Sequence, residues 1–173
     1  MDCAEIRFLK WRYEVLFIVL PEVSMFRQVV RVRNILIMKL LLKLSPGVFF
    51  TLNSALRIHD LTDENPMRMT MAISSNSHAP KTTLPVDFVY MKKELLSEDV
   101  EEFTPNGIMF RVFSVERTIV ECFKARKRMG INICVASLDE AMAKRRIDRK
   151  RLWDVMSRCR MTRIMSPYLE GRV

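Results

Sequence analysis

The stretch FSVERTIVECFKARKRMG, residues 113–130, carries every signal of a single helix. Ser114 suits the N-cap, because its hydroxyl can accept a hydrogen bond from a free backbone N–H of the first turn. Glu116 lies in that turn, where the helix dipole favours negative charge. Gly130 ends the pattern, since glycine tolerates the left-handed conformation that stops a helix. The apolar residues recur at helical spacing on one face, as Val115, Ile119, Cys122 and Phe123. We expect this helix to organise the fold.

Only helices are predicted on the C-terminal side of this stretch. The first covers residues 133–146, and its predicted buried face consists of Cys134, Val135, Leu138 and Met142. Asp148 suits the N-cap of the next helix. Residues from Thr162 onward are expected to form a last helical turn or two. Pro167 either kinks that segment or starts a new one.

Strands are predicted on the N-terminal side of the stretch. Apolar and polar residues alternate over residues 67–73 and again over residues 86–90, with a polar loop between them. Two more strands, at residues 100–103 and 108–113, are joined by Thr104-Pro105-Asn106-Gly107. The Asn-Gly pair tolerates the positive φ angles of a tight hairpin. The middle of the chain is therefore expected to form a small, mostly antiparallel sheet.

Helices are predicted again before the sheet. From Arg31 the apolar residues follow helical spacing, and Ser45 and Pro46 suit the N-cap and the first position of a second helix, which runs to His59. The predicted fold class is therefore α+β. Its small, mostly antiparallel sheet of four strands is flanked by N-terminal and C-terminal helices.

The charge of the chain is unevenly distributed. Its 173 residues are 49% apolar and 28% charged, which suits one compact domain with or without a partial second. The net charge is +9, and residues 114–173 alone contribute +8, from 15 Lys/Arg and 7 Asp/Glu. Such a basic segment indicates a polyanionic partner, usually nucleic acid. A solvated cationic surface is the alternative interpretation.

Three basic clusters supply the predicted binding residues. One closes the helix over residues 113–130, one closes the following helix, and one opens the helix after Asp148, where the dipole disfavours cations. If the three helices pack side by side, the clusters share one edge that could bind phosphate backbone or an acidic protein face. Trp153 could stack on a base there, although half-buried packing is the favoured role. The ten predicted residues are Lys124, Arg126, Lys127, Arg128, Lys144, Arg145, Arg146, Arg149, Lys150 and Arg151.

Few residues suggest catalysis. The sequence contains no glycine-rich phosphate loop, and the compact acid–base cluster of His59, Asp63 and Glu64 is explained equally well by helix-end capping and turn formation. An enzymatic role requires these three side chains to converge in an open cleft facing the basic edge. We therefore expect no enzyme, no catalytic residue and no cofactor.

Neither a metal site nor a membrane span is expected. The four cysteines show no C-x-x-C spacing, and only His59 and His78 could join them as ligands. Reduced thiols in the core of a cytoplasmic protein are the default interpretation. The longest apolar runs are too short or interrupted by lysine, so no membrane partner is predicted.

Several stretches match a family pattern in order along the chain. The run SALRIHDLTDE, residues 54–64, fits S-A-L-x-x-H-x-L-T-D-E. Residues 112–124 fit V-x-S-x-x-x-T-[IV]-x-[DE]-[CL]-F-K, and residues 126–130 fit a pattern like R-N-K-I-G. Residues 142–146, 159–160 and 167–170 continue the match. Over about residues 46–171 the chain resembles the AbiEi-type antitoxins of type IV toxin–antitoxin systems, which are linked to abortive phage infection.

The resemblance implies an antitoxin that counteracts a nucleotidyltransferase toxin encoded alongside it, without necessarily forming a stable complex. Members of the family usually carry an N-terminal winged-helix domain that binds operator DNA and represses transcription of its own operon. Their C-terminal region carries the antitoxic activity. The implied partners are therefore operator DNA and the cognate toxin.

The N-terminal segment departs from that pattern. Residues 1–45 show no clear recognition helix and no Gly-rich wing, so we expect an atypical segment there, a remnant of a winged-helix domain. Truncation, a shift of frame or replacement would each produce this pattern. Residues 46–173 are expected to form the antitoxin domain. Two other hypotheses stay open: a nucleic-acid-processing enzyme that uses His59, Asp63 and Glu64, and an inactive remnant of an antitoxin.

Overall fold

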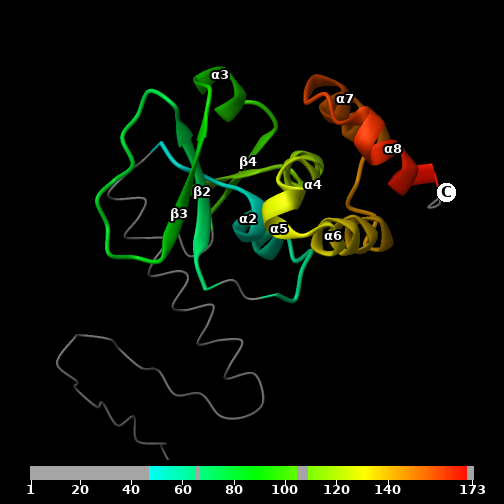
Figure 1. Ribbon diagram of the computed structural model, residues 1–173, viewed down its shortest axis with the longest axis horizontal. Helices are drawn as coiled ribbons and strands as arrows, with labels where there is room; N and C mark the ends of the chain where they lie inside the picture. The colour runs from blue at the N-terminus through cyan, green and yellow to red at the C-terminus, as the bar shows by residue number, and fades with distance from the viewer. Residues whose placement is uncertain (1–46, 65–66, 105–108, 171–173) are drawn as a thin grey trace, which may run out of the picture. The chain divides into compact units, whose positions relative to one another are not determined.

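The computed structural model describes residues 47–64, 67–104 and 109–170 (Figure 1). Five strands are formed within these residues: β1 (Phe49–Phe50), β2 (Met69–Ser74), β3 (Val86–Met91), β4 (Val100–Phe103) and β5 (Phe110–Phe113). They are accompanied by seven helices: α2 (Leu52–Ile58), α3 (Lys93–Leu96), α4 (Val115–Lys124), α5 (Arg126–Met129), α6 (Ile131–Ala143), α7 (Arg149–Arg158) and α8 (Thr162–Glu170). The predictions for residues 1–46 and for the Asn-Gly turn lie outside the described residues.

The strands form one mixed sheet in the order β3-β2-β1-β5-β4. Strands β4 and β5 pair antiparallel, with Phe103 opposite Phe110, as expected for the predicted hairpin. Strands β1 and β2 are also antiparallel. The pairs β1–β5 and β2–β3 are parallel. The α+β class is confirmed, but the prediction of four mostly antiparallel strands is wrong.

Two local causes explain the difference in the sheet. Strand β1 contains only Phe49 and Phe50, which leaves no alternation to detect, and it occupies the segment predicted as the start of a helix. Helix α2 begins only at Leu52, with Thr51 at its N-cap. Residues 75–85 return the chain along the length of β2, about 20 Å for a six-residue strand. Strand β3 therefore runs parallel to β2, although no helix connects them.

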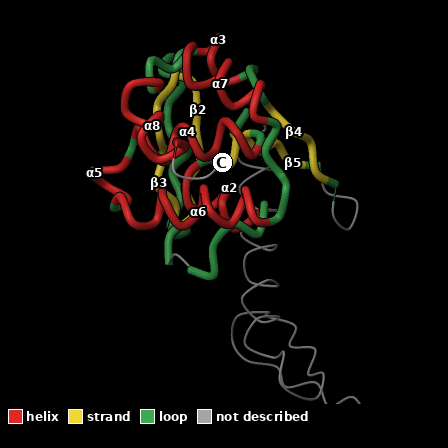
Figure 2. The backbone as a smooth tube through the Cα atoms, turned by 90° about the vertical axis from the view of Figure 1, so that its right-hand side faces the viewer, coloured by secondary structure: helices red, strands yellow, loops and turns green. Residues whose placement is uncertain are grey.

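The helices pack on one face of the sheet in two layers. Phe49, Ala72 and Phe113 come from three neighbouring strands and share a cluster with Leu96 of α3. The guanidinium of Arg117 in α4 lies 5.4 Å from the centre of the Phe113 ring, so α4 faces this side. Figure 2 shows the helices in front of the strands, and Figure 1 shows α2 and α4 between the sheet and α6, α7 and α8.

Helix α4 confirms the prediction that the fold is organised around residues 113–130. The hydroxyl of Ser114 accepts a hydrogen bond from the N–H of Arg117 at 3.3 Å, and nine of the ten residues of α4 are buried. The predicted apolar stripe packs into the main core together with residues of α2, α6, α7 and α8. Helix α4 is therefore covered on all sides rather than on one face.

The predicted extent of this helix is wrong at its C-terminal end. Helix α4 ends at Lys124, Ala125 breaks it, and the short helix α5 carries the chain to Gly130. Gly130 has φ +88° and ψ +133°, which differs from the left-handed helical conformation expected for a helix stop. The break turns the chain so that α6 can run back along α4.

The remaining helices largely follow the prediction. Helix α6 starts two residues earlier than predicted and buries Cys134, Ser137, Leu138 and Ala141. The Asp148 carboxylate accepts hydrogen bonds from the backbone N–H groups of Lys150 and Arg151, as expected for an N-cap. Helix α8 continues through Pro167 without ending there.

The backbone of Gly130 generates a stability prediction. Its φ and ψ combination belongs to the region that glycine alone adopts readily. We expect Gly130→Ala to lower the free energy of unfolding by about 1–3 kcal/mol. A Cβ at Gly130 would meet no atom within 4 Å, so the cost is backbone strain and not a clash.

The matched control is Gly47→Ala. Gly47 also has open space where alanine would place its Cβ, but its φ is not positive. This change should leave the free energy of unfolding unchanged or raise it slightly, because alanine restricts the unfolded chain. Chemical denaturation of both variants checks the pair. Equal effects would contradict a special backbone at Gly130.

Candidate functional site

The burial of α4 brings three charged side chains into the protein interior, namely Glu116, Arg117 and Glu121. Arg117 and Glu121 have side chains only 1% and 5% exposed, and Arg117 Nη2 lies 2.8 Å from Glu121 Oε1. Arg117 Nη1 donates a hydrogen bond to Cys159 Sγ at the end of α7, at 3.2 Å. The guanidinium also faces the Phe113 ring. Arg117 therefore connects the sheet, α4 and α7.

Glu116 connects α4 to the start of α7. Its Oε1 accepts a hydrogen bond from the backbone N–H of Asp148 at 3.0 Å, and its Oε2 lies 3.8 Å from Arg151 Nε. Arg151 also approaches Asp99, with 3.8 Å between Nη2 and Oδ1. Arg158, about two turns further along α7, binds Asp99 at 2.6 Å and Glu98 at 2.8 Å. The inner side of α7 is thus paired with acidic residues of the rest of the domain.

The basic cluster at the end of α6 binds the C-terminal end of α2. Arg146 Nη1 donates to the His59 carbonyl at 2.6 Å. Lys144 Nζ donates to the Asp60 carbonyl at 2.6 Å and lies 2.9 Å from its carboxylate. The last carbonyls of a helix lack partners within the helix, and its dipole favours cations there. The hydrogen bond to Asp60 raises the pKa of Lys144 above its usual value.

The basic cluster after α4 contacts its own helix. Lys124 Nζ lies 3.6 Å from Glu121 Oε1, and Arg126 Nη1 donates to the Phe123 carbonyl at 3.1 Å. Lys127 and Arg128 are exposed and carry their charge into solvent. This cluster therefore both caps α4 and presents two cations at the surface.

The ten predicted binding residues do not share one edge. Residues 144–151 lie at the N-terminal end of α4, where Glu116 contacts Asp148 and Arg151. Residues 124–128 follow the other end of α4. Helix α6 spans the distance between the two clusters with 13 residues, about 20 Å. The structure therefore forms two separate basic regions.

The outer side of α7 presents three exposed side chains that we call the α7 face: Arg149, Lys150 and Trp153. Trp153 follows the other two by four and three residues, so the three side chains lie on the same side of the helix. Trp153 is 45% exposed, which agrees with the half-buried packing expected of it and leaves part of its ring accessible. Cations bind phosphates, and an exposed aromatic ring can stack on bases.

His59 does not lie in an open cleft. It is fully buried, its Nε2 donates to the Phe113 carbonyl at 2.7 Å, and its ring packs edge-on against Phe103. Burial lowers the pKa of His59 from its usual value of 6.5. Asp63 and Glu64 are exposed. The arrangement that the enzyme hypothesis requires is therefore absent at His59.

The described residues contain no group of three or more His, Cys, Asp or Glu side chains that could hold a metal ion. In the same part of the chain, no helix is long and apolar enough to cross a membrane. Cys122, Cys134 and Cys159 are free thiols, and burial raises the pKa of Cys122 well above its usual value. These thiols pack in the core and are not activated as nucleophiles.

The buried charges of α4 generate a second prediction. Glu121→Gln leaves the Arg117 cation buried without a counter-charge, so we expect a loss of about 3–5 kcal/mol in the free energy of unfolding. Combining Glu121→Leu with Arg117→Met removes both charges and should destabilise less than Glu121→Gln alone. Denaturant unfolding measures both variants.

Lys124→Ala is the control for this pair. Lys124 is 49% exposed and lies at 3.6 Å from Glu121, so its loss should cost at most about 1 kcal/mol. A Glu121→Gln variant as stable as Lys124→Ala would show that the buried pair contributes little.

The stretches that resemble the antitoxin family meet around α4. His59 in the first stretch donates a hydrogen bond to the carbonyl of Phe113 in the second, and Arg146 in a later stretch donates one to the carbonyl of His59. The rings of Phe123 and Tyr168 lie 5.3 Å apart. A comparison with models of known protein families finds no match, and a comparison with curated proteins finds none either.

Proposed function

We propose that this protein is an antitoxin of the AbiEi type, which counteracts a nucleotidyltransferase toxin and acts by binding rather than by catalysis. One observation supports this most directly. The stretches that resemble the family are far apart in the sequence, yet they form one connected unit through His59, Phe113, Arg117, Arg146 and Cys159. If the family has a common fold, the stretches that match its pattern have to pack together in this way.

A binding role agrees with the chemistry of the exposed residues. The imidazole of His59 is buried and donates to a backbone carbonyl, so it is not presented to a ligand. The α7 face instead combines two cations with an exposed indole. We therefore assign nucleic-acid contact to the α7 face, where phosphate binding positions the partner without reading its sequence.

Regulation of its own operon belongs to the same proposal. In the family this role depends on the N-terminal domain, and residues 1–46 lie outside the described part of the chain. The α7 face would add non-specific affinity to such binding. The cognate toxin remains a functional partner for which no stable complex is required.

Co-expression rescue tests the proposal. We expect growth of a bacterial host that expresses the neighbouring toxin gene to be restored by the full chain, and to be reduced again by the triple change Arg149→Ala, Lys150→Ala and Trp153→Ala. The control is Lys92→Ala with Lys93→Ala, which removes two exposed cations from the start of α3. Absence of rescue by a soluble, folded chain against a toxic neighbour would exclude antitoxin function.

Nucleic-acid binding tests the α7 face separately. Lys150→Ala with Trp153→Ala should weaken binding of a single-stranded oligonucleotide. The slope of log K against log salt should fall by about 0.7 for each phosphate contact that the substitutions remove. Fluorescence anisotropy at several salt concentrations measures both quantities. An unchanged slope would place the contact elsewhere, and Lys92→Ala with Lys93→Ala serves again as the control.

A further inference from the structure

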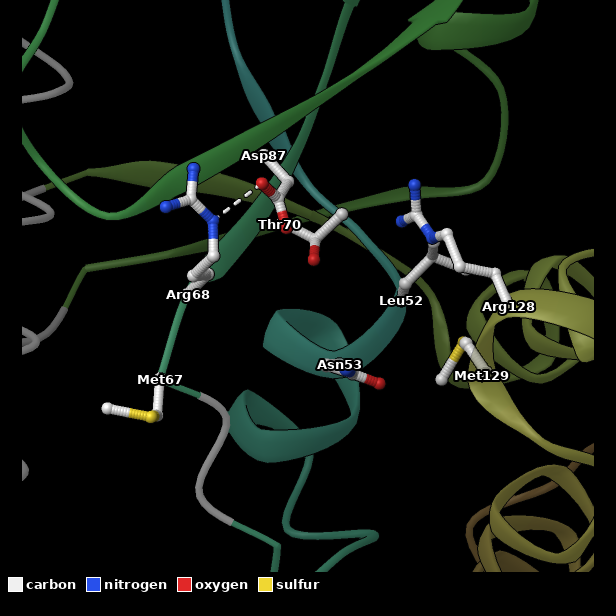
Figure 3. A pocket seen from close by; sticks show the side chains of 8 residues that line it. All are labelled: Leu52, Asn53, Met67, Arg68, Thr70, Asp87, Arg128 and Met129. Carbon is white, nitrogen blue, oxygen red and sulfur yellow. Dashed lines mark hydrogen bonds and ion pairs between the residues drawn. The ribbon is translucent and has the colours of Figure 1, made fainter.

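A cavity of about 570 Å³ opens beside the sheet (Figure 3). Four separate segments contribute to it: the start of α2, the start of β2, the edge strand β3 and the end of α5. Its volume lies in the range typical of small-molecule sites. It is lined by Leu52, Asn53, Met67, Arg68, Thr70, Asp87, Arg128 and Met129.

One side of the cavity holds a fixed guanidinium. Arg68 Nε donates to Asp87 Oδ1 at 2.7 Å, and Arg68 Nη2 donates to the Val86 carbonyl at 2.9 Å. These two bonds hold the side chain in place and leave Nη1 available for another acceptor. Asp87 offsets the charge of Arg68. The sign of the net charge of the cavity lining therefore depends on a second cation.

Arg128 supplies that second cation from the opposite side of the cavity. Figure 3 shows its guanidinium across from the pair formed by Arg68 and Asp87. Arg128 is exposed and makes no ion pair within the described residues. The cavity therefore has one excess positive charge, and two guanidinium groups border it. Guanidinium groups bind phosphate through paired hydrogen bonds.

The rest of the lining suits a flat ring with polar edges. Met67 and Met129 contribute thioethers, which make favourable contacts with aromatic rings. Met67 is 86% exposed, so this apolar side chain has little protein around it. Asn53 and the buried Thr70 add an amide and a hydroxyl that can pair with ring nitrogens or with a sugar.

The backbone at the cavity is also strained. Leu52 has φ +48°, a conformation that a leucine rarely adopts. Such strain persists where the surrounding structure enforces it and is frequent at ligand sites. Leu52 is the first residue of α2 and lines the cavity together with Asn53, the next residue in the chain.

We propose that this cavity binds a nucleoside monophosphate. The phosphate lies between Arg128 and Arg68, the base packs against Met67 and Met129, and Asn53 and Thr70 pair with polar atoms of the base or sugar. A free mononucleotide and the terminal nucleotide of a 5′-phosphorylated oligonucleotide offer this same chemistry. The site does not depend on the antitoxin proposal, since it assigns Arg128 to a cavity and not to the α7 face.

Isothermal titration calorimetry on the full chain tests the site. The ligands are AMP, GMP, CMP and UMP, the matching nucleosides, and inorganic phosphate. We expect at least one nucleotide to bind about tenfold or more tightly than its nucleoside and than phosphate, because both the ring and the phosphate are contacted. Arg128→Ala should weaken nucleotide binding by about tenfold or more, because it removes a charge-assisted contact.

Lys127→Ala is the matched control, because Lys127 is an exposed cation beside Arg128 that does not line the cavity. It should leave nucleotide binding unchanged, as should Lys150→Ala with Trp153→Ala. Met67→Ala should weaken binding of the nucleotide but not of phosphate. Equal binding of phosphate and nucleotides, or equal losses in Lys127→Ala and Arg128→Ala, would overturn the proposal, as would no detectable nucleotide binding.

Oligonucleotides separate the two sources of the ligand. A short 5′-phosphorylated oligonucleotide that binds more tightly than the mononucleotide, and loses this advantage on removal of its phosphate or in Arg128→Ala, identifies a nucleic-acid end as the ligand. Weaker binding of the oligonucleotide identifies the free nucleotide. Both results support the site.

Discussion

The complete burial of α4 is the constraint on which the rest of the structure depends. The helix contains Glu116, Arg117 and Glu121, and none of these charges reaches bulk water. A buried charge without a partner costs several kcal/mol, so each neighbouring element has to supply a compensating group. The ends of α7 do so, with the backbone N–H of Asp148 at one end and Cys159 at the other. The position of α7 follows from this requirement.

Contacts within the domain also change the interpretation of the basic C-terminal segment. Its net charge of +8 suggests a polyanionic ligand, yet several cations bind groups within the domain. Arg146 and Lys144 bind the carbonyls at the end of α2, and Arg158 binds the acidic pair Glu98 and Asp99. Part of the charge therefore holds the C-terminal helices against the preceding half of the domain. Composition alone overstates the cationic surface available to a ligand.

The sequence predicted the elements whose signals are local. Ser114 and Asp148 cap the helices as expected, because a cap depends on a few neighbouring residues. The prediction failed where tertiary contacts decide. Thr70 alternates with apolar residues, which is typical of an exposed position, but β2 is buried on both sides. Strand β1 is too short for a pattern, and its two neighbours, one parallel and one antiparallel, come from distant parts of the chain.

The candidate sites were also only partly predictable from the sequence. The basic clusters were visible in the sequence, but their separation by the length of α6 was not, because it depends on the turn at Ala125 and Gly130. The cavity was not predicted at all. Arg68, Asp87 and Arg128 have no common spacing, and the pairing of β2 with β3 brings the first two together.

Several of the residues on which the proposed antitoxin assignment rests have structural contacts, and this determines which positions can report on function. His59, Arg117 and Arg146 hold the elements together through buried or backbone contacts. Changing them would alter the fold before it altered any partner, so loss of activity there would say nothing about recognition. Exposed side chains that make no such contacts, such as Lys150, Trp153 and Arg128, can be replaced without disturbing the core. Recognition by this protein has to be sought at those positions, because the packing of the domain does not require their side chains.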